Sequence, residues 1–386
     1  MSEKIKVIRT ATVPLSLDYL LKGQLHYLNQ AFEVVAVSGT DAHLANVAQR
    51  EQVRVAEVTM ERPISPIKDI ISLWQLYRLF KKEKPRIVHS ITPKAGLLTM
   101  MAGKMAGVPV RIHTFTGLIF PSKRGFLQKI LITMDRLLCF CASNIYPEGQ
   151  GVKNDLIHYK ITSKPLKVLA NGNVNGIDTQ YFSRKQISTT DQERLKTELG
   201  IDEGAFVFIF VGRLAGDKGI NELVTAFERL SAESENVKLL LVGPLESELD
   251  PLKPTTLDAI KQNPKIKSVG FQKEVRSYFA ISDALVFPSY REGFPNVVMQ
   301  SGAMELPSIV TDINGCNEII AEGQNGMIIP AKDDKALEVA MIKMMKDTAL
   351  YQQLKLNARA MITSRYKQKV VWEALLEEYR RLEQNV

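Results

Sequence analysis

The chain has 386 residues, of which 45% are hydrophobic and 24% are charged, with three cysteines and a formal net charge of +8. We expect two domains, because a single hydrophobic core rarely serves more than about 250–300 residues. The composition excludes a low-complexity or disordered chain. Lys104 interrupts the most apolar stretch, so we expect no membrane-spanning helix. The N-terminus runs directly into a strand-like segment, and we expect no signal peptide.

The charge is divided unevenly along the chain. Residues 1–170 hold 24 Lys and Arg against 12 Asp and Glu, a net +12, whereas residues 171–386 hold 26 against 30, a net −4. A basic half suggests an acidic partner such as a phosphate-bearing substrate, an anionic membrane surface or nucleic acid. An ordinary solvated surface explains it equally well. Cys139, Cys141 and Cys316 have neither an even number nor a zinc-like spacing, which favours buried thiols in a reducing, cytoplasmic setting.

Short apolar segments alternate with helical patterns throughout, which is typical of parallel sheets in doubly wound α/β domains. The strand candidates of the first half are IKVIRT, FEVVAVSG, RVAEV, PRIVHSI, VRIHTFT and ASNIYPEG. Those of the second half are FVFIFVGR, VKLLLVG, IKSVGF, ALVFPS, SIVTD and GMIIP. Two such series predict two Rossmann-like domains, over residues 1–170 and 186–364.

Two segments outside these series also carry a signal. NGNVNGIDTQYFSRKQISTTDQ is rich in Asn, Gly, Ser and Thr, and we interpret it as a linker between the domains. Residues 365–386 carry apolar side chains at helical spacing, which predicts an amphipathic helix that must pack on another element. These side chains belong to Val371, Leu375, Tyr379 and Leu382.

Two loops after apolar strands carry residues suited to an anionic ligand. VGRLAGDKG places Arg213 and Lys218 five residues apart across a Gly-rich turn, so both could reach one phosphate group, although such cations are more often solvated. YREGFPNVVMQ places Glu292 on a strand-to-helix loop, where the N–H groups of residues 293–296 favour an anion. Carboxylates also accept hydrogen bonds from sugar hydroxyls. Cations, N–H groups and an acid together suggest a nucleotide-sugar.

This set of segments resembles the retaining glycosyltransferases of family 4. It comprises VLANGNVNGID, VGRLAGDKGI, LLLVGP, VGFQKEV, YFAISDALVFPSYREGFPNVVMQSGAMELPSIVTDINGCNEII and GQNGMIIP, and the fifth of these is highly specific. VPLSLDYLLKGQLHYL and VHSITPKAGLLTMMAGKMAGVPVRIHTFTG resemble the branch that builds bacterial capsular, exopolysaccharide and O-antigen units. The resemblance implies the GT-B fold, with two Rossmann-like domains facing across a cleft and a C-terminal helix that crosses back to the first domain.

The resemblance also implies roles for individual residues. Arg213 and Lys218 would hold the donor diphosphate and stabilise the leaving nucleotide, and Glu292 would contact the donor sugar. Further donor contacts would fall on Gly212, Gly243, Phe294, Pro295, Asn296, Val297, Gln300, His113, Thr116 and Gly23.

Some of these positions depart from the family pattern. Gln300 stands where a second acid usually accepts hydrogen bonds from the ribose, and its amide keeps one acceptor oxygen, so the change affects donor affinity more than chemistry. Where the family often has Thr-x-His, either His113 fills the place by a local shift or Thr116 contributes a hydroxyl. A structural role is the more common one for a histidine at a strand end. Gly23 matches a Gly-rich loop beside the donor phosphates, but an ordinary helix turn fits equally well.

The implied activity is transfer of a hexose or N-acetylhexosamine, with retention at the anomeric carbon, from a UDP-sugar to a growing polyprenyl-diphosphate-linked glycan in bacterial surface polysaccharide synthesis. We expect no cofactor and no metal, since family members commonly need none and the sequence has no Asp-x-Asp and no His or Cys cluster. A GT-B nucleotide-sugar epimerase is the alternative. A nicotinamide dehydrogenase would need a glycine-rich motif after the first strand, and this sequence has none there. Nucleic-acid binding is not indicated either, because no basic motif with interleaved aromatic residues is present.

The segment PSKRGFLQKILITMDRLL predicts contact with the anionic inner face of the cytoplasmic membrane. Its cations lie among apolar residues, as in a helix that rests in an interface, and each cation near an anionic surface is worth about 1 kcal/mol. The residues are Lys123, Arg124, Lys129, Phe126, Leu127, Ile130 and Leu131. The alternative is that the apolar residues are core and the cations form its solvated rim.

Overall fold

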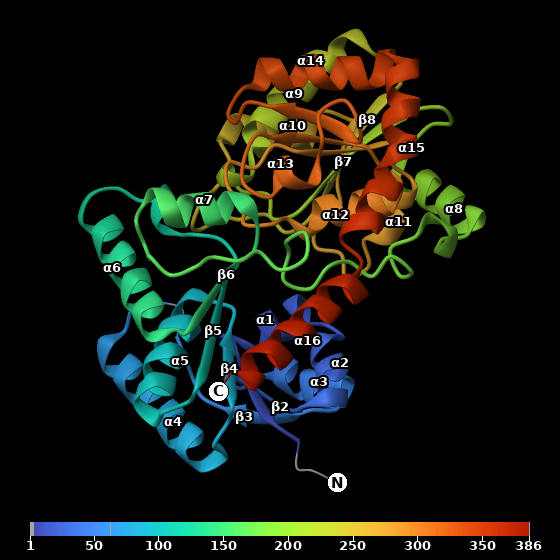
Figure 1. Cartoon of the computed structure of the whole chain (residues 1–386). Helices are drawn as coiled ribbons and strands as arrows, with labels where there is room; N and C mark the ends of the chain where they lie inside the picture. The colour runs from blue at the N-terminus through green and yellow to red at the C-terminus, as the bar shows by residue number, and fades with distance from the viewer. Residues whose placement is uncertain (1–3, 62, 386) are drawn as a thin grey trace. The chain divides into compact units, whose positions relative to one another are not determined.

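Every strand segment predicted from the sequence forms a strand in the computed structural model, which describes residues 4–61 and 63–385. The chain divides into two units, one made of residues 1–176 and 368–386 and the other of residues 177–367. Each unit contains one six-stranded parallel sheet, in the order β3-β2-β1-β4-β5-β6 in the first and β12-β11-β10-β7-β8-β9 in the second (Figure 1). Both are doubly wound, so the predicted pair of Rossmann-like domains is confirmed.

The elements of the first unit follow the predicted alternation. Its strands are β1 (Lys6–Thr10), β2 (Glu33–Ser38), β3 (Arg54–Glu57), β4 (Ile87–Ser90), β5 (Val110–Phe115) and β6 (Asn144–Pro147). Its helices are α1 (Pro14–Leu20), α2 (Gln24–Ala31), α3 (Ala42–Glu51), α4 (Pro66–Glu83), α5 (Pro93–Ala106), η1 (Phe120–Ser122), α6 (Gly125–Cys141), α7 (Gln150–His158) and α16 (Gln368–Gln384).

The second unit repeats this pattern. Its strands are β7 (Phe206–Val211), β8 (Val237–Val242), β9 (Ile266–Ser268), β10 (Ala284–Phe287), β11 (Ser308–Thr311) and β12 (Gly326–Ile329). Its helices are η2 (Arg184–Gln186), α8 (Thr189–Leu199), η3 (Gly216–Lys218), α9 (Ile220–Glu233), α10 (Pro254–Gln262), α11 (Arg276–Ala280), α12 (Asn296–Ala303), α13 (Cys316–Ile319), α14 (Asp334–Lys346) and α15 (Thr348–Arg365).

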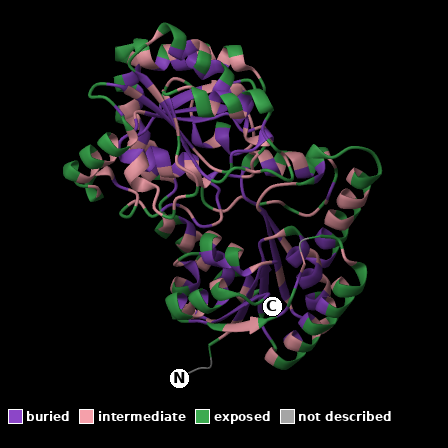
Figure 2. Cartoon of the chain, turned by 180° about the vertical axis from the view of Figure 1, so that it is seen from behind, coloured by how far each residue is buried: buried purple, intermediate pink, exposed green. Residues whose placement is uncertain are grey.

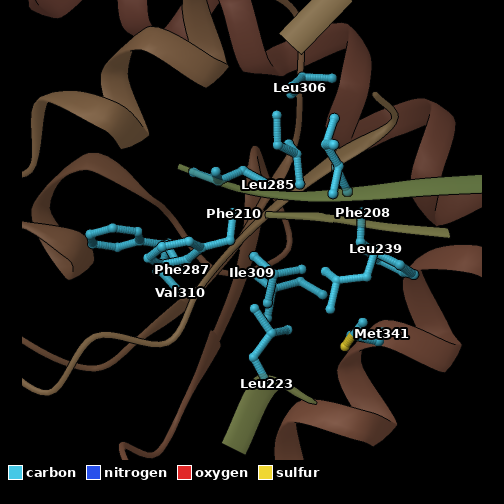
Figure 3. Packing of buried hydrophobic residues seen from close by; sticks show 14 of the residues in the cluster. Phe208, Phe210, Leu223, Leu239, Leu285, Phe287, Leu306, Ile309, Val310 and Met341 are labelled. Carbon is cyan, nitrogen blue, oxygen red and sulfur yellow. The ribbon is translucent and has the colours of Figure 1, made fainter. Parts of the chain in front are cut away.

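The central strands are apolar because helices cover both faces of each sheet. Val207, Phe208, Ile209 and Phe210 of β7 are all buried, and they belong to one core cluster with Leu239 of β8, Leu285 of β10 and Ile309 of β11 (Figure 3). Figure 2 shows the same arrangement in each unit, with buried strands between partly exposed helices. A continuous apolar run therefore marks a central strand here.

Helix α16 packs on the first sheet, as the sequence predicted. Its four apolar residues at helical spacing are all buried. Tyr379 accepts a hydrogen bond from Arg9 Nη1 at 3.1 Å and its hydroxyl lies 2.6 Å from His89 Nδ1, so the helix is tied to β1 and β4. Helix α16 thus belongs to the core of the first unit, although it follows the second unit in the sequence.

The segment predicted as a linker is more structured than expected. Its last residues begin α8, because the Ser188 side chain accepts a hydrogen bond from the Asp191 N–H and caps that helix. Its first residues belong to the first unit, where Gln24 Nε2 donates to the Val174 carbonyl at 2.8 Å and Trp372 Nε1 donates to Asn175 Oδ1 at 2.7 Å. Capping and side-chain hydrogen bonds order a stretch whose composition alone indicated a loop.

Candidate active site

The two predicted anion-binding loops lie at the point where the order of the second sheet reverses. β7 and β10 are neighbours in that sheet, and open α/β sheets bind ligands beyond the carboxyl ends of such a strand pair. η3 follows β7 and carries Lys218, whereas the loop between β10 and α12 carries Glu292. Lys218 Nζ lies 2.5 Å from Glu292 Oε1, and both side chains are 18% exposed. The structure therefore brings these two predicted residues together.

Glu292 is held on one oxygen only. Ser289 Oγ donates to Oε1 at 2.8 Å, so this oxygen has two donors. In the described ranges, Oε2 accepts no hydrogen bond, which leaves it for a hydroxyl group. Burial raises the pKa of the Cys316 thiol well above its usual range, and the Glu292 charge adds to this shift, so the thiol beside the pair is neutral.

The turn that carries Lys218 is fixed by its neighbours. The Asp217 N–H donates to Asp250 Oδ2 at 2.5 Å, and the Tyr290 N–H donates to the Asp217 carbonyl at 2.9 Å. Gly219 has φ +71°, and a Cβ there would lie 2.1 Å from the Pro288 carbonyl oxygen. Only glycine allows this approach, which holds the Lys218 turn against the Glu292 loop.

Arg213 has a partner of its own. Its Nη1 lies 2.9 Å from Glu246 Oε2, and its side chain is 48% exposed. The N–H groups of Glu248 and Leu249, together with Arg213, hold the pKa of Glu246 below its ordinary value. Each predicted phosphate-binding cation is thus paired with a separate carboxylate. A diphosphate that bound both cations would compete with Glu246 and Glu292.

Gly212 and Gly243 serve a backbone contact between two loops. The Gly212 N–H donates to the Val242 carbonyl at 2.9 Å, and the Gly243 N–H donates to the Gly270 carbonyl at 2.8 Å. A Cβ on Gly243 would lie 1.8 Å from the Gly212 carbonyl oxygen. Both N–H groups therefore donate hydrogen bonds within the second unit. A contact of these two glycines with the nucleotide-sugar stays a prediction.

The residues after Glu292 form the predicted strand-to-helix loop and helix start. Phe294 is buried and packs edge-on against Tyr366 with ring centres 5.5 Å apart. Pro295 is the N-cap residue of α12, and Asn296 is its first residue. Val297 and Gln300 are half-buried on that helix. The Phe294 ring anchors the loop in the core. The backbone of Phe294, rather than its ring, is therefore the part that could contact the nucleotide-sugar.

In the first unit, His113 is enclosed rather than exposed. Its Nδ1 lies 2.8 Å from Ser90 Oγ, its ring stands edge-on to Phe115, and a Cβ on Gly96 would lie 2.5 Å from the ring. Burial lowers the pKa of His113 to about 3, so the ring is neutral. Thr116 is half-buried, and its hydroxyl donates to the Ile91 carbonyl at 3.0 Å. A sugar contact at His113 would require its surroundings to open, and both donor contacts stay predictions.

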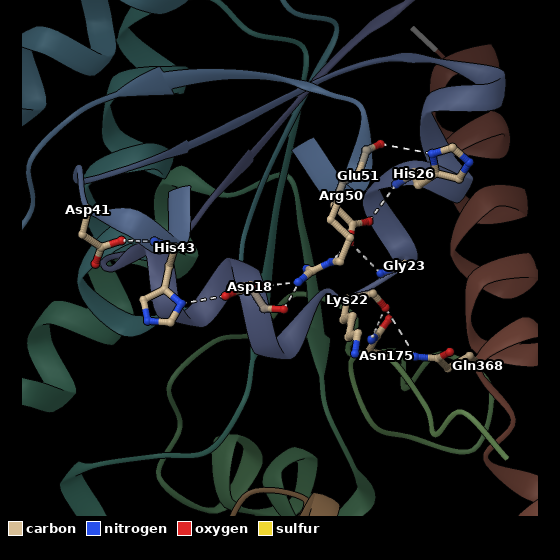
Figure 4. A network of polar contacts seen from close by, with 10 residues as sticks. All are labelled: Asp18, Lys22, Gly23, His26, Asp41, His43, Arg50, Glu51, Asn175 and Gln368. Carbon is tan, nitrogen blue, oxygen red and sulfur yellow. Dashed lines mark hydrogen bonds and ion pairs between the residues drawn. The ribbon is translucent and has the colours of Figure 1, made fainter. Parts of the chain in front are cut away.

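Gly23 lies in a network of polar contacts at the start of α2 (Figure 4). Its N–H donates to Glu51 Oε1 at 2.9 Å, and a Cβ there would lie 2.7 Å from the Trp372 ring. The neighbouring Lys22 carbonyl accepts from Asn175 Nδ2 at 3.0 Å. Packing accounts for this glycine, and its phosphate contact stays a prediction.

Comparison with known proteins assigns the chain to a family. The model for "Glycosyltransferase Family 4" matches residues 21–180, and that for "Glycosyl transferases group 1" matches residues 191–361. The capsular polysaccharide biosynthesis glycosyltransferase CapM of Staphylococcus aureus is 31% identical over 97% of this chain and 96% of CapM. The chain belongs to glycosyltransferase family 4. Its enzyme class is therefore that of a glycosyltransferase, and these relatives do not support the epimerase alternative.

Further relatives of this family 4 protein are also glycosyltransferases or share its fold. A UDP-Gal:alpha-D-GlcNAc-diphosphoundecaprenol alpha-1,3-galactosyltransferase of Escherichia coli is 28% identical over 76% of this chain and 74% of that protein. A glycosyltransferase of Rickettsia africae has a TM-score of 0.80 at 18% identity, covering 99% of this chain and all of that one. Anabaena HepE in complex with UDP has a TM-score of 0.79 at 18% identity, covering 98% and 100%. The two structures show the shared GT-B fold.

Sequence reasoning missed several residues that shape the site of this family 4 enzyme. Ser289 stands three residues before Glu292, and that short spacing is a signal for its hydrogen bond. Glu246 and Asp250 lie in the loop after β8, which has no periodic pattern. Cys316 begins α13 and is buried, as the sequence predicts for the three cysteines, but no sequence pattern indicates its proximity to Glu292.

Proposed function

We propose that this family 4 enzyme transfers a hexose or N-acetylhexosamine, with retention, from a UDP-sugar to a polyprenyl-diphosphate-linked glycan during assembly of a bacterial capsular or related polysaccharide. The observation that carries the proposal is the Lys218–Glu292 pair at the reversal point of the second sheet. It sets a cation for a diphosphate beside a carboxylate with one free oxygen for a sugar hydroxyl. Similarity to CapM over nearly the whole chain supports the polysaccharide.

The donor and acceptor classes have separate support. UDP is bound in the HepE structure, and the name of the Escherichia coli relative gives a UDP-sugar donor and a diphosphoundecaprenol-linked acceptor. Because identity to these proteins is low, they support a class of substrate and leave the particular sugar open. Gln300 on α12 offers one acceptor oxygen to the ribose of the nucleotide.

In the proposed reaction, the bond between the anomeric carbon and the diphosphate oxygen breaks and a bond to the acceptor oxygen forms on the same face of the sugar, while the acceptor hydroxyl gives its proton to the departing diphosphate. Negative charge grows on the departing diphosphate. Lys218 and Arg213 would offset that charge after exchanging their carboxylate partners for phosphate oxygens. Preorganised cations of this kind often supply the largest part of catalysis.

We propose that no cofactor or metal takes part, because two side-chain cations already face the leaving group in this scheme.

We also propose that the enzyme works in the cytoplasm at the anionic inner face of the cytoplasmic membrane. A lipid-linked acceptor is confined to a membrane, and the basic first half of the chain is suited to an anionic surface. The three cysteines are buried and unpaired, in keeping with a reducing compartment.

A donor screen tests the proposal. Purified enzyme is incubated with each common UDP-sugar and a short-chain polyprenyl-diphosphate-linked N-acetylhexosamine, and UDP release is measured. We expect release with one donor only when the acceptor is present, in buffer containing a chelator, and an NMR spectrum of the product with the donor's anomeric configuration. Conversion of the UDP-sugar to an isomer without any acceptor would instead identify an epimerase.

A further inference from the structure

Helix α4 carries a row of exposed apolar side chains that its own packing does not use. Ile67, Ile70, Ile71 and Trp74 follow the i, i+3, i+4, i+7 spacing of one helix face and are 77%, 66%, 52% and 55% exposed. Ile64, just before the helix, is 52% exposed. We call these five residues the α4 row. A solvated helix normally presents charged or polar residues on such a face.

The other face of α4 already packs inside the unit. Ser72, Leu76 and Phe80 are buried, and α4 lies against α5. The helix is therefore apolar on two faces, of which only one is covered. Contiguous exposed apolar patches are uncommon on soluble monomers and mark interaction sites. The α4 row thus requires a partner surface.

A second exposed apolar segment begins at the same edge of the first sheet. α4 follows β3 and α6 follows β5, and in a parallel sheet helices that follow strands start at the carboxyl edge. α5 lies between them, in contact with both (Figure 1). At the start of α6, Phe126 is 79% exposed and Leu127 is 44% exposed. The two segments therefore flank the start of α5.

The charges around these segments favour an anionic partner. Lys123, Arg124 and Lys129 are exposed beside Phe126 and Leu127, and residues 116–134 contain no Asp or Glu. The acidic residues near the α4 row are neutralised, because Asp69 is paired with the buried Lys94 at 2.7 Å and Glu61 is paired with Lys68. Apolar side chains beside cations that are unpaired within the described ranges, as at the start of α6, are the pattern of an interfacial membrane contact.

We propose that the α4 row and the start of α6 form one membrane-binding face, in which the α4 row enters the headgroup boundary of an anionic bilayer and the cations of residues 123–129 bind its headgroups. No helix within the described ranges is long and apolar enough to cross a membrane. The inference rests on the proposed function in one respect, since a lipid-linked acceptor places the substrate in that bilayer. A second copy of the chain is the competing occupant of the face.

Tryptophan fluorescence can report on this face directly. The chain has two tryptophans, and Trp372 donates its Nε1 to Asn175 at 2.7 Å in the first unit. In a Trp372→Phe background, the emission of Trp74 should shift to shorter wavelength on addition of vesicles rich in phosphatidylglycerol. Lipids brominated on the acyl chain should quench it. In the Trp74→Phe background, the emission of Trp372 should change little.

Vesicle sedimentation with substituted protein completes the test. Ile67→Asp with Ile70→Asp should weaken binding to anionic vesicles by roughly tenfold or more, because both side chains lose their apolar contact. Leu356→Asp is the matched control, since Leu356 is 80% exposed on α15 in the other unit. Circular dichroism melts establish that each variant is folded.

The outcomes separate this inference from the proposed function. Unchanged Trp74 emission with vesicles, together with equal pelleting of the double variant, would overturn the membrane face even if UDP-sugar transfer to a water-soluble acceptor analogue proceeds. A wild-type dimer in sedimentation equilibrium that the double variant abolishes would assign the face to a second copy and also overturn the proposal. Vesicle binding without transfer from any UDP-sugar would retain the face and reject the function.

Discussion

Lys218 and Glu292 are 74 residues apart in the sequence, yet Nζ of the first lies 2.5 Å from Oε1 of the second. The pair joins the loops after two adjacent parallel strands, and its two charges balance each other. In the proposed reaction, a diphosphate with two or more negative charges would attract Lys218 more strongly than the single negative charge of Glu292 does. Glu292 would then be released toward a sugar hydroxyl, so one rearrangement would engage both ends of the donor.

The first prediction concerns the two cations. Lys218→Ala and Arg213→Ala should each lower turnover by on the order of 10² or more, because in the proposed function each cation would offset charge on the departing diphosphate. Initial rates at saturating UDP-sugar give the measurement. Arg194→Ala is a suitable control, since Arg194 is 69% exposed and pairs only at the surface of α8. Wild-type turnover in both site variants would remove the donor-site assignment.

The second prediction compares two positions on either side of the α12 N-terminus. Glu292→Gln should impair transfer far more than Gln300→Glu, because it removes the charge that pairs with Lys218 and that, in the proposed function, would accept a sugar hydroxyl. Gln300→Glu should leave activity similar or tighten UDP binding, since a carboxylate accepts ribose hydroxyl bonds more strongly than an amide. Initial transfer rates compare the activity of the two variants, and calorimetry with UDP measures their nucleotide binding. Loss of UDP binding in Gln300→Glu would contradict the ribose assignment.

The sequence predicted the fold for physical reasons, and the family resemblance placed Lys218 and Glu292 in one donor site without predicting their contact. Buried parallel strands are continuous apolar runs, so every strand could be placed, and parallel strands end at one edge, which brought Lys218 to Glu292. The carboxylate partner of Arg213 was not predictable, because Glu246 lies in an irregular loop whose path depends on tertiary packing. The burial of His113 was also not evident, since a polar residue in a strand does not reveal which helix covers it.

The third prediction concerns pH and a carboxyl group in the first unit. Burial on α6 raises the pKa of Asp135 to about 7 from an ordinary value of 3.8. Between these two values the folded protein binds more protons than the unfolded chain, so this group's contribution to stability is lost as pH rises. Asp135→Asn keeps the shape and removes the titration. The variant should therefore be increasingly more stable than wild type from about pH 5 to about pH 8.

Thermal unfolding followed by circular dichroism across that pH range gives the comparison. Asp258→Asn is the matched control, because Asp258 is an exposed carboxylate on α10. It should change the unfolding temperature by a small amount at every pH. Parallel curves for wild type and Asp135→Asn would show that Asp135 is ionised in the folded protein throughout the range.

The fourth prediction isolates the electrostatic part of membrane binding. Lys123→Glu with Arg124→Glu should release the protein from anionic vesicles while leaving UDP binding intact, because the two cations precede α6 at the carboxyl edge of the first sheet. Lys81→Glu with Lys82→Glu makes the same change in charge at the opposite end of α4 and should leave binding nearly unchanged. Wild type should bind anionic but not neutral vesicles, and less at high salt, where exposed charges are screened. Equal loss of binding in both double variants would show that net charge alone, rather than this edge of the first unit, draws the protein to the surface.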